Sequence, residues 1–318
     1  MSDKNLLEVS QITKATEFGK VLSKVSFDLK FHENLVIAGA TGSGKSTLLK
    51  IIAGLEQPDS GTVTLEGKPV AGPADTLVPG HPKIAYLSQH FELPKFLRVE
   101  QVLRYASNVT DAYHRQILSI CKITHLAARK TDQLSGGEKQ RIAIARLLVT
   151  HPQVLLLDEP YSHLDTGLKA TLKEVVSKIS SKLGVTCVLV SHHPEDTLPW
   201  AHRVLVMKNG VIVQQGLPQQ VYQQPKNEYV ARLFGAYNLV DKPLARLLGK
   251  SNVSNKILRP EHFEIIKRKS GRWVVSETEY FGSYYLVTVE YQERRIKVFT
   301  LRQWAVGEFA ELRLNQSI

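Results

Sequence analysis

The stretch that decides the fold is Leu35-Val-Ile-Ala-Gly-Ala-Thr-Gly-Ser-Gly-Lys-Ser46. It opens with the apolar run Leu35–Ala38, typical of a buried strand, and leads into Leu48–Ala53, whose apolar spacing predicts a helix with one buried face. Between them lie glycine, four residues, glycine, lysine and serine, which is the phosphate-loop pattern. The pattern requires a strand before it and a helix after it, so a chance glycine-rich loop is the weaker interpretation.

The residues of this loop suit a nucleotide phosphate chain. Glycines let successive backbone N–H groups turn towards phosphate oxygens, and the N-terminus of the following helix adds positive potential. We expect Lys45 to reach the β- and γ-phosphates of ATP and Ser46 to offer its hydroxyl to Mg²⁺. The predicted nucleotide-binding residues here are Gly39, Thr41, Gly42, Ser43, Gly44, Lys45, Ser46 and Thr47.

Two acids follow a second apolar run, Val154–Leu157. Carboxylates at the end of a buried strand are costly unless they serve a cation or a proton. We expect Asp158 to bind Mg²⁺ and Glu159 to polarise the water that attacks the γ-phosphate. The alternative is that these acids merely end a strand. A phosphate loop in the same chain makes this alternative the weaker interpretation.

Residues 1–235 alternate strand-like and helix-like segments around this loop. Continuous apolar runs such as Thr186–Ser191 suit strands buried on both faces of a parallel sheet. Gly61–Gly67 alternates with period two and predicts an antiparallel hairpin, whereas residues 92–133 look mostly helical. The predicted fold class is therefore α/β, with a mostly parallel sheet, a helical subdomain and an antiparallel β subdomain.

The pattern changes after Pro225 to short segments rich in β-branched and aromatic residues. These segments are Val274–Ser276, Tyr284–Tyr291, Arg295–Phe299 and Phe309–Leu314. We expect residues 236–318 to form a small, separate β domain that resembles a barrel.

The bulk composition excludes some classes of protein. No run of about 18 apolar residues occurs, and the N-terminal residues lack the apolar core of a signal peptide, which predicts a protein that is neither membrane-spanning nor exported. The net charge of +11 invites a nucleic-acid interpretation, but the excess is spread along the chain without a basic stripe. Cys121 and Cys187 are expected to be buried, reduced thiols.

A second glycine-rich element leads to a family. Leu134-Ser-Gly-Gly-Glu-Lys-Gln-Arg141 precedes a helix-like segment and resembles the signature of the ABC transporter ATPases. This resemblance implies that Ser135, Gly136 and Gly137 contact the γ-phosphate of ATP bound by the other subunit of a dimer. Ser135 also suits the N-cap of the helix, but capping alone does not explain the paired glycines.

Further elements of that family follow in the family's order. The resemblance implies that Gln89 touches Mg²⁺ and links to the membrane partner, that Asp165 lies at the dimer interface, and that His192 lies near the γ-phosphate. Phe18 is the candidate for stacking on adenine, with a plain core aromatic as the alternative. His193 follows His192 at a position where the family often has an aspartate. This difference bears on how the His192 ring is oriented.

The tail carries a second resemblance. Ile257-Leu-Arg-Pro-Glu-His-Phe-Glu-Ile265 resembles the strand that opens the TOBE domain, an OB-like barrel of importer ATPases. It implies a subunit that energises import of polyamines, ferric iron, sulfate, molybdate or sugars. The implied partners are a second copy or a paired ABC subunit, two transmembrane permease subunits and an extracytoplasmic solute-binding protein, with no nucleic acid. The chain would then be cytoplasmic, at the inner face of the membrane. An exporter ATPase, or an ABC ATPase acting on ribosomes or nucleic acid, is the alternative.

Overall fold

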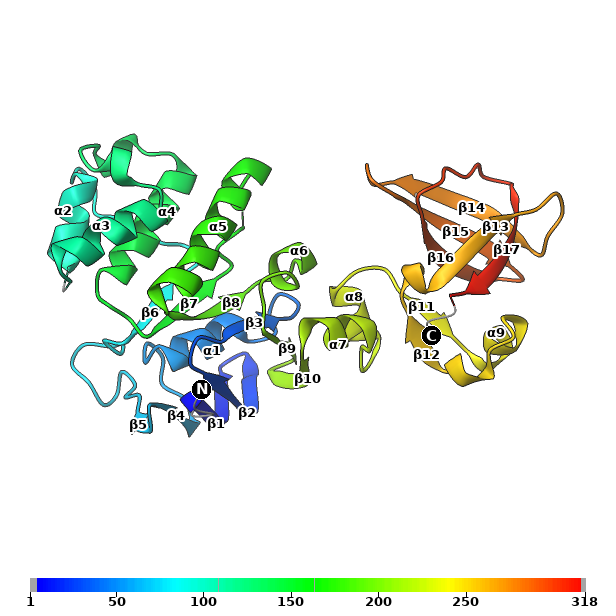
Figure 1. Ribbon diagram of the computed structural model, residues 1–318. Coiled ribbons are helices and arrows are strands. Elements are labelled where there is room, and N and C mark those ends of the chain that lie inside the picture. Colours follow the sequence, from blue (N-terminus) through cyan, green and yellow to red (C-terminus); the bar gives the residue numbers. More distant parts are fainter. Residues whose placement is uncertain (1–4, 108, 163, 316–318) are drawn as a thin grey trace. The chain divides into compact units, whose positions relative to one another are not determined.

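The computed structural model describes residues 5–107, 109–162 and 164–315. It divides into two compact units, residues 1–218 and 219–318 (Figure 1). No helix in the described residues is long and apolar enough to cross a membrane.

A six-stranded sheet organises the first unit, in the order β10-β9-β3-β8-β7-β6. The strands are β10 (Val211–Gly216), β9 (Arg203–Lys208), β3 (Asn34–Ala38), β8 (Thr186–Val190), β7 (Val154–Asp158) and β6 (Ile84–Leu87). They pair in parallel except for β10, which is antiparallel to β9. Every residue of β3, β7 and β8 is buried, which explains their continuous apolar runs.

A four-stranded antiparallel sheet lies beside it, in the order β2-β1-β4-β5. Its strands are β1 (Asn5–Thr16), β2 (Gly19–Lys30), β4 (Ser60–Leu65) and β5 (Lys68–Pro69). Inward side chains of this sheet share one apolar core with β3 and with α1 (Lys45–Ile52). The predicted hairpin at 61–67 is confirmed as β4 and β5, while β1 and β2 are additional strands.

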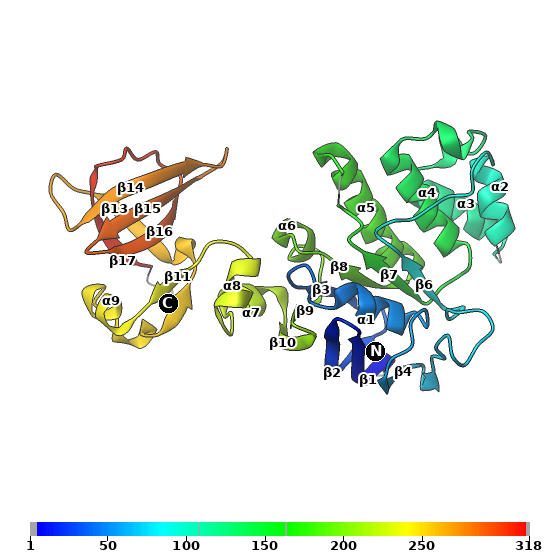
Figure 2. The same ribbon diagram turned by 180° about the vertical axis from the view of Figure 1, so that it is seen from behind.

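Helices form the rest of the first unit. They are α2 (Val99–Ala106), α3 (Asp111–Ile120), α4 (Gly136–Leu148), α5 (Thr166–Leu183) and α6 (Pro194–Thr197), with 3₁₀ turns η1 (Thr124–Leu126) and η2 (Thr131–Gln133). Both Figure 1 and Figure 2 show α2, α3 and α4 gathered at one end of the unit and the antiparallel sheet at the other. The predicted helical region starts later than residue 92: the chain around Pro94 is irregular, Phe96 has a φ of +65°, and α2 begins at Val99.

The second unit is built on a five-stranded antiparallel sheet, in the order β13-β17-β14-β15-β16. Its strands are β13 (Phe263–Lys267), β17 (Phe309–Leu314), β14 (Trp273–Tyr280), β15 (Tyr285–Tyr291) and β16 (Arg294–Thr300). Because β13 also contacts β16, the sheet curves back on itself around a core of its own. The remaining elements are α7 (Pro218–Gln223), α8 (Glu228–Leu233), β11 (Asn238–Val240), α9 (Lys242–Leu247), η3 (Ser251–Val253), β12 (Lys256–Leu258) and η4 (Pro260–His262). The expected β domain is confirmed.

The stretch 257–265, expected as one strand, is instead split. Its start pairs with β11 as β12, its end pairs with β17 as β13, and η4 lies between them. The break falls at Pro260, which starts the 3₁₀ turn and has no N–H to donate to a strand ladder.

Arg259, just before that break, is 1% exposed and binds the chain between α7 and β11. Its Nε donates to the Tyr222 carbonyl oxygen (2.9 Å), and its Nη1 donates to the carbonyl oxygens of Ala231 (2.9 Å), Gly235 (3.3 Å) and Ala236 (3.1 Å). The guanidinium also lies 4.2 Å from the centre of the Tyr222 ring. These contacts explain why the compact unit begins at 219, before the boundary expected at 235. The ATPase and TOBE-like domain limits themselves stay predictions.

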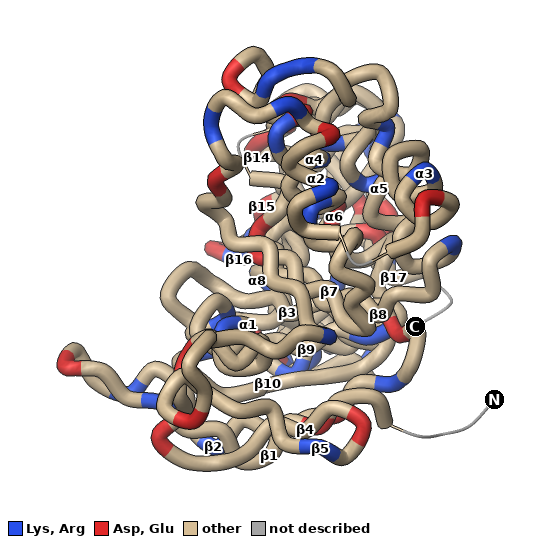
Figure 3. Tube along the Cα trace, turned by 90° about the vertical axis from the view of Figure 1, so that its left-hand side faces the viewer, with Lys and Arg blue, Asp and Glu red and all other residues tan. Residues whose placement is uncertain are grey.

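Charges and thiols follow the sequence-based expectations. Figure 3 shows Lys and Arg interspersed with Asp and Glu along the tube. Cys121 and Cys187 are free and buried, and burial raises the pKa of each thiol to about 12, so both stay protonated at neutral pH.

Arg259→Met is predicted to destabilise the second unit selectively. The four carbonyl groups lose a charged donor in a site closed to water, and the free energy of unfolding should fall by about 2–4 kcal/mol. Denaturant unfolding followed by fluorescence measures this, because Trp273 and Trp304 are buried in this unit. Arg295→Met, at a half-exposed arginine of β16, is the control and should change the free energy by less than about 0.5 kcal/mol. Equal losses in the two variants would contradict the assigned role of Arg259.

Candidate functional site

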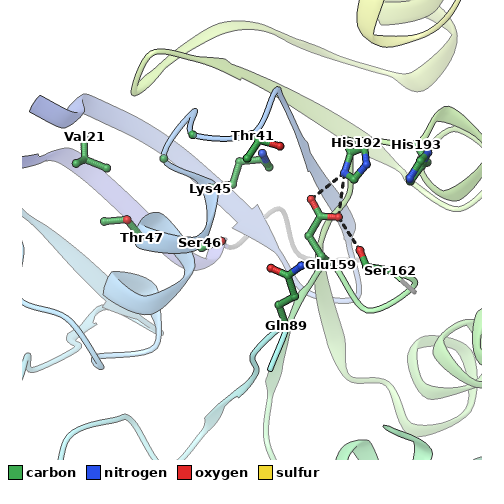
Figure 4. Close-up of a pocket in the computed structure, with 12 residues that line it drawn as sticks. Val21, Thr41, Lys45, Ser46, Thr47, Gln89, Glu159, Ser162, His192 and His193 are labelled. Carbon is green, nitrogen blue, oxygen red and sulfur yellow. Dashed lines mark hydrogen bonds and ion pairs between the residues drawn. The ribbon is translucent and has the colours of Figure 1, made fainter. Parts of the chain in front are cut away.

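A pocket of about 620 Å³ opens in the first unit where neighbouring parallel strands end (Figure 4). The residues that line it come from the loops after β3, β6, β7 and β8, from the first turn of α1 and, for one residue, from β2. They are Val21, Thr41, Gly42, Gly44, Lys45, Ser46, Thr47, Gln89, Glu159, Ser162, His192 and His193. The carboxyl edge of a parallel sheet is where such folds bind ligands, and this volume suits a small molecule.

The phosphate loop joins β3 to α1 as predicted. Gly44 has a φ of +95°, and a Cβ there would lie 2.8 Å from the Val21 carbonyl oxygen, so the position requires glycine. Lys45 is 6% exposed, and its Nζ donates to the carbonyl oxygens of Gly39 and Ala40 at 2.9 Å each. Burial lowers the pKa of Lys45, while the carboxylates of Glu159 and Asp158 act in the opposite direction. A cation is thus held among the loop's backbone groups.

Asp158 ends β7 and is buried behind the pocket, not in its wall. The Tyr86 hydroxyl donates to its Oδ2 at 2.9 Å, and burial together with Asp158 raises the pKa of Tyr86, so the phenol keeps its proton. The other carboxylate oxygen of Asp158, Oδ1, is buried and has no hydrogen-bond partner in the described part of the chain. An orphaned carboxylate oxygen fits a cation or a water bound to a cation.

Glu159 points into the pocket (Figure 4). Its φ of +50° lies in the left-handed region, and its N–H donates to the Val190 carbonyl oxygen at 3.1 Å. The Ser162 hydroxyl donates to its Oε2 at 3.0 Å, and His192 Nδ1 lies 2.9 Å from Oε1. A strained backbone held by this many contacts is typical of a functional position.

Gln89 and the two histidines complete the wall. Gln89 follows β6, and its side chain points towards Glu159 in Figure 4. The rings of His192 and His193 lie 4.0 Å apart between centres, and His193 Nδ1 lies 3.8 Å from Glu195. The pocket therefore brings Glu159, Gln89 and His192 together with most of the predicted phosphate loop, while Gly39 and Ser43 of that loop do not line it. Sequence reasoning missed Val21, Ser162 and His193 as wall residues.

The signature residues lie elsewhere in the unit. Ser135 is the N-cap of α4: its hydroxyl accepts from the Glu138 N–H at 3.3 Å, while the Glu138 carboxylate accepts from the Ser135 N–H at 2.8 Å. That bond from Ser135 lowers the pKa of Glu138. A Cβ on Gly136 would meet open space, whereas one on Gly137 would lie 2.9 Å from Leu168. None of the three predicted signature residues lines the pocket.

Two other predicted residues also lie outside the pocket wall. Asp165 caps α5 by accepting from the Leu168 N–H at 2.9 Å. Phe18 lies between β1 and β2 and is 92% exposed, which excludes the core-aromatic alternative and leaves its ring free for a ligand.

Known proteins resemble the chain in sequence and in fold. Residues 22–162 match the ABC transporter family. The spermidine/putrescine import ATP-binding protein PotA of Clostridioides difficile (strain 630) is 33% identical over 307 residues, 88% of this chain and 87% of that protein. The protein of the same name from Mycoplasma capricolum is 30% identical over 346 residues, 99% and 95% of the two chains.

Among solved structures, cbiO1 from Clostridium perfringens, part of the ABC transporter complex cbiONQ, has a TM-score of 0.60 at 28% identity. The similarity covers 69% of this chain and 91% of that one. A phosphate loop, a signature at the start of α4 and these relatives lead to one conclusion: the chain belongs to the ABC transporter ATP-binding proteins and is an importer-type ATPase.

Proposed function

We propose that two copies of this chain clamp two ATP molecules and thereby drive polyamine import through membrane permease subunits. One observation carries the proposal. The pocket gathers the phosphate loop with Glu159 and His192, but Ser135, Gly136 and Gly137 lie outside it in the same chain. A second copy would supply these residues to the other side of the nucleotide, which makes the complete site a property of the dimer.

The pocket residues can carry out hydrolysis within this arrangement. Loop N–H groups and Lys45 bind the phosphates, and the exposed Phe18 stacks on adenine. Glu159 accepts a proton as water adds to the γ-phosphorus and the bond to the bridging oxygen breaks, releasing ADP and phosphate. His192, oriented by its contact with that carboxylate, stabilises the departing γ-phosphate.

The donor set also fits Mg²⁺. Ser46 and Gln89 offer oxygens at the pocket and Asp158 has its orphaned Oδ1 behind it, a sparse set that suits an ion which also binds phosphate and water. When bound, the ion neutralises charge on the β- and γ-phosphates.

The clamp closes because ATP binds the closed state better. The γ-phosphate can reach Ser135 and the N-terminus of α4 in the second copy only when the copies approach each other. Asp165, at the start of α5, would lie along the same interface. After hydrolysis these contacts weaken and the clamp reopens.

A surface beside Gln89 is the proposed contact with the permease. Phe91 and Leu93 line a groove with residues of η2 and α4, and the Phe96 side chain is 70% exposed. An exposed aromatic that follows Lys95, another residue of this groove, suits a partner helix and explains why Phe96 is not in the core. In this arrangement the chain sits at the inner face of the membrane, with two permease subunits and an extracytoplasmic solute-binding protein as partners.

The relatives favour polyamines over the other solutes of the importer branch, because both relatives described above are named for spermidine and putrescine. The same names disfavour an exporter or a ribosome-associated ATPase. Cells in which Lys45→Ala replaces the natural chain should take up labelled spermidine and putrescine as poorly as cells that lack the chain. Uptake of an unrelated amino acid is the control. Full polyamine uptake, with loss of uptake of sulfate, iron or a sugar, would assign the importer to that other solute.

Phe96→Asp should uncouple import from hydrolysis. A charge at an exposed contact costs little in the free chain but opposes an apolar interface, so uptake should fall about 10-fold or more while the ATPase rate of the isolated chain stays within about twofold. Tyr105→Asp is the matched control, since Tyr105 is an aromatic of α2 that is 75% exposed but lies outside the proposed contact. Equal uptake in the two variants would rule out Phe96 as part of the permease contact.

A further inference from the structure

We propose that Asp196 is a positioning residue for ATP hydrolysis: held by Lys169 and Lys173 of α5, it fixes residues 191–197 so that His192 meets Glu159. The inference rests on the role proposed above for His192. It adds a group that does not touch the nucleotide pocket and that no sequence motif singled out.

Asp196 is a buried carboxylate with two cationic partners. The residue is 2% exposed, and its Oδ1 lies 2.9 Å from Lys169 Nζ and 2.7 Å from Lys173 Nζ. The two lysines are four residues apart on one face of α5. Lys173 Nζ also donates to the Glu195 carbonyl oxygen at 2.7 Å. Taking these charges out of water costs desolvation free energy that offsets their attraction, so a buried ion pair can do more to fix the arrangement of the segments that it joins than to stabilise the fold.

The same carboxylate contacts the residue before His192 and, through that residue's hydroxyl, is linked to the residue after it. The Ser191 hydroxyl donates to Asp196 Oδ2 at 3.5 Å and accepts from the His193 N–H at 3.2 Å. The His193 ring contacts the His192 ring, with 4.0 Å between the centres and a tilt of 41° between the planes. His192 Nδ1 in turn lies 2.9 Å from the Glu159 carboxylate. The imidazole is therefore placed by a chain of contacts that ends at Asp196.

The other end of the network is the first turn of α5. Lys169 N–H donates to the Asp165 carbonyl oxygen at 2.9 Å, and Leu168 packs against Gly137 at the start of α4. The first turn of α5 thus contacts the signature at Gly137 and the proposed dimer-interface residue Asp165. Through the ion pair between Lys169 and Asp196, it also contacts the segment that carries His192. A shift of α5 on dimer closure would move His192 with it. The competing interpretation is an ion pair that only stabilises the fold.

Asp196→Asn is the first test. The amide keeps the size of the side chain but removes the charge that holds both lysines. With the full chain, kcat for ATP hydrolysis should fall about 10-fold, as expected for a reacting group that is displaced slightly, while KM for ATP stays within about twofold because the phosphate loop is untouched. Lys173→Met, at a part-exposed lysine, is a second route to the same defect if the first variant does not fold.

Glu174→Gln is the matched control. Glu174 is a carboxylate of α5 next to Lys173, but its side chain is 46% exposed and pairs with Lys122 and Lys178, away from the segment that carries His192. Its kcat should match the parent chain. A loss equal to that of Asp196→Asn would overturn the proposal, because a general change in charge would then explain both.

A double-mutant cycle with His192→Ala separates positioning from simple stabilisation. If Asp196 acts through His192, Asp196→Asn should cause no further loss of kcat in the His192→Ala background. Multiplicative losses would overturn the inference while leaving the role of His192 intact. A wild-type kcat for His192→Ala alone would instead contradict the proposed function and, with it, the inference.

Histidine-labelled NMR decides the matter if the His192→Ala background is too slow to measure. The His192 ring signals, assigned by their loss in His192→Ala, should shift in Asp196→Asn and Lys173→Met but not in Glu174→Gln. Unchanged His192 signals in folded Asp196→Asn would overturn the proposal.

Discussion

The parallel pairing of β7 with β8 is the constraint on which the site depends. Its register sets Asp158 opposite Val190, and the Glu159 N–H continues the ladder to the Val190 carbonyl oxygen. The chain then leaves the two strands at neighbouring points of the sheet edge. As a result, the Nδ1 atom of His192 lies 2.9 Å from the Oε1 atom of Glu159. Because every residue of both strands is buried, a slip in this register would bury a polar group or expose an apolar one. The pairing of β7 with β8 therefore sets the relative positions of Glu159 and His192 without the help of a ligand.

Both units contain buried charged side chains that are held by specific polar partners. In the first unit the Lys45 ammonium is held by loop carbonyls, and Asp196 is held by two lysines. In the second unit Arg259 is held by four carbonyl oxygens. Hydrogen bonds and ion pairs are directional, so the partners of each buried charge fix the position of its side chain and of the segment that carries it. An apolar contact is not directional and would allow that segment more than one position. In the first unit these segments carry residues that we propose to bind and hydrolyse ATP.

The sequence predicted the parts of the fold that have local signals. The phosphate loop, the apolar runs of β7 and β8 and the hairpin of β4 were identified because glycine spacing and periodicity belong to the segment itself. Strand β1 was missed because register shifts, such as the one between Val9 and Ile12, break its alternation. Helix α2 was expected too early because apolar residues such as Phe91 and Leu93 line a groove and do not form a helix face. The contacts of Asp196 with α5 and of Arg259 with the chain between α7 and β11 join residues from different elements, so no single stretch encodes them.

The central claim is that one complete site needs two copies of the chain. Its most direct test mixes Lys45→Ala chains with Ser135→Arg chains, carrying different tags, and measures ATP hydrolysis. A hybrid dimer has one composite site with both lesions and one with neither. Since about half of randomly formed dimers are hybrids, equal mixing should restore about a quarter of the parent activity although each variant alone is inactive. Hybrids that co-purify by both tags yet hydrolyse no faster than either variant alone would contradict the shared site.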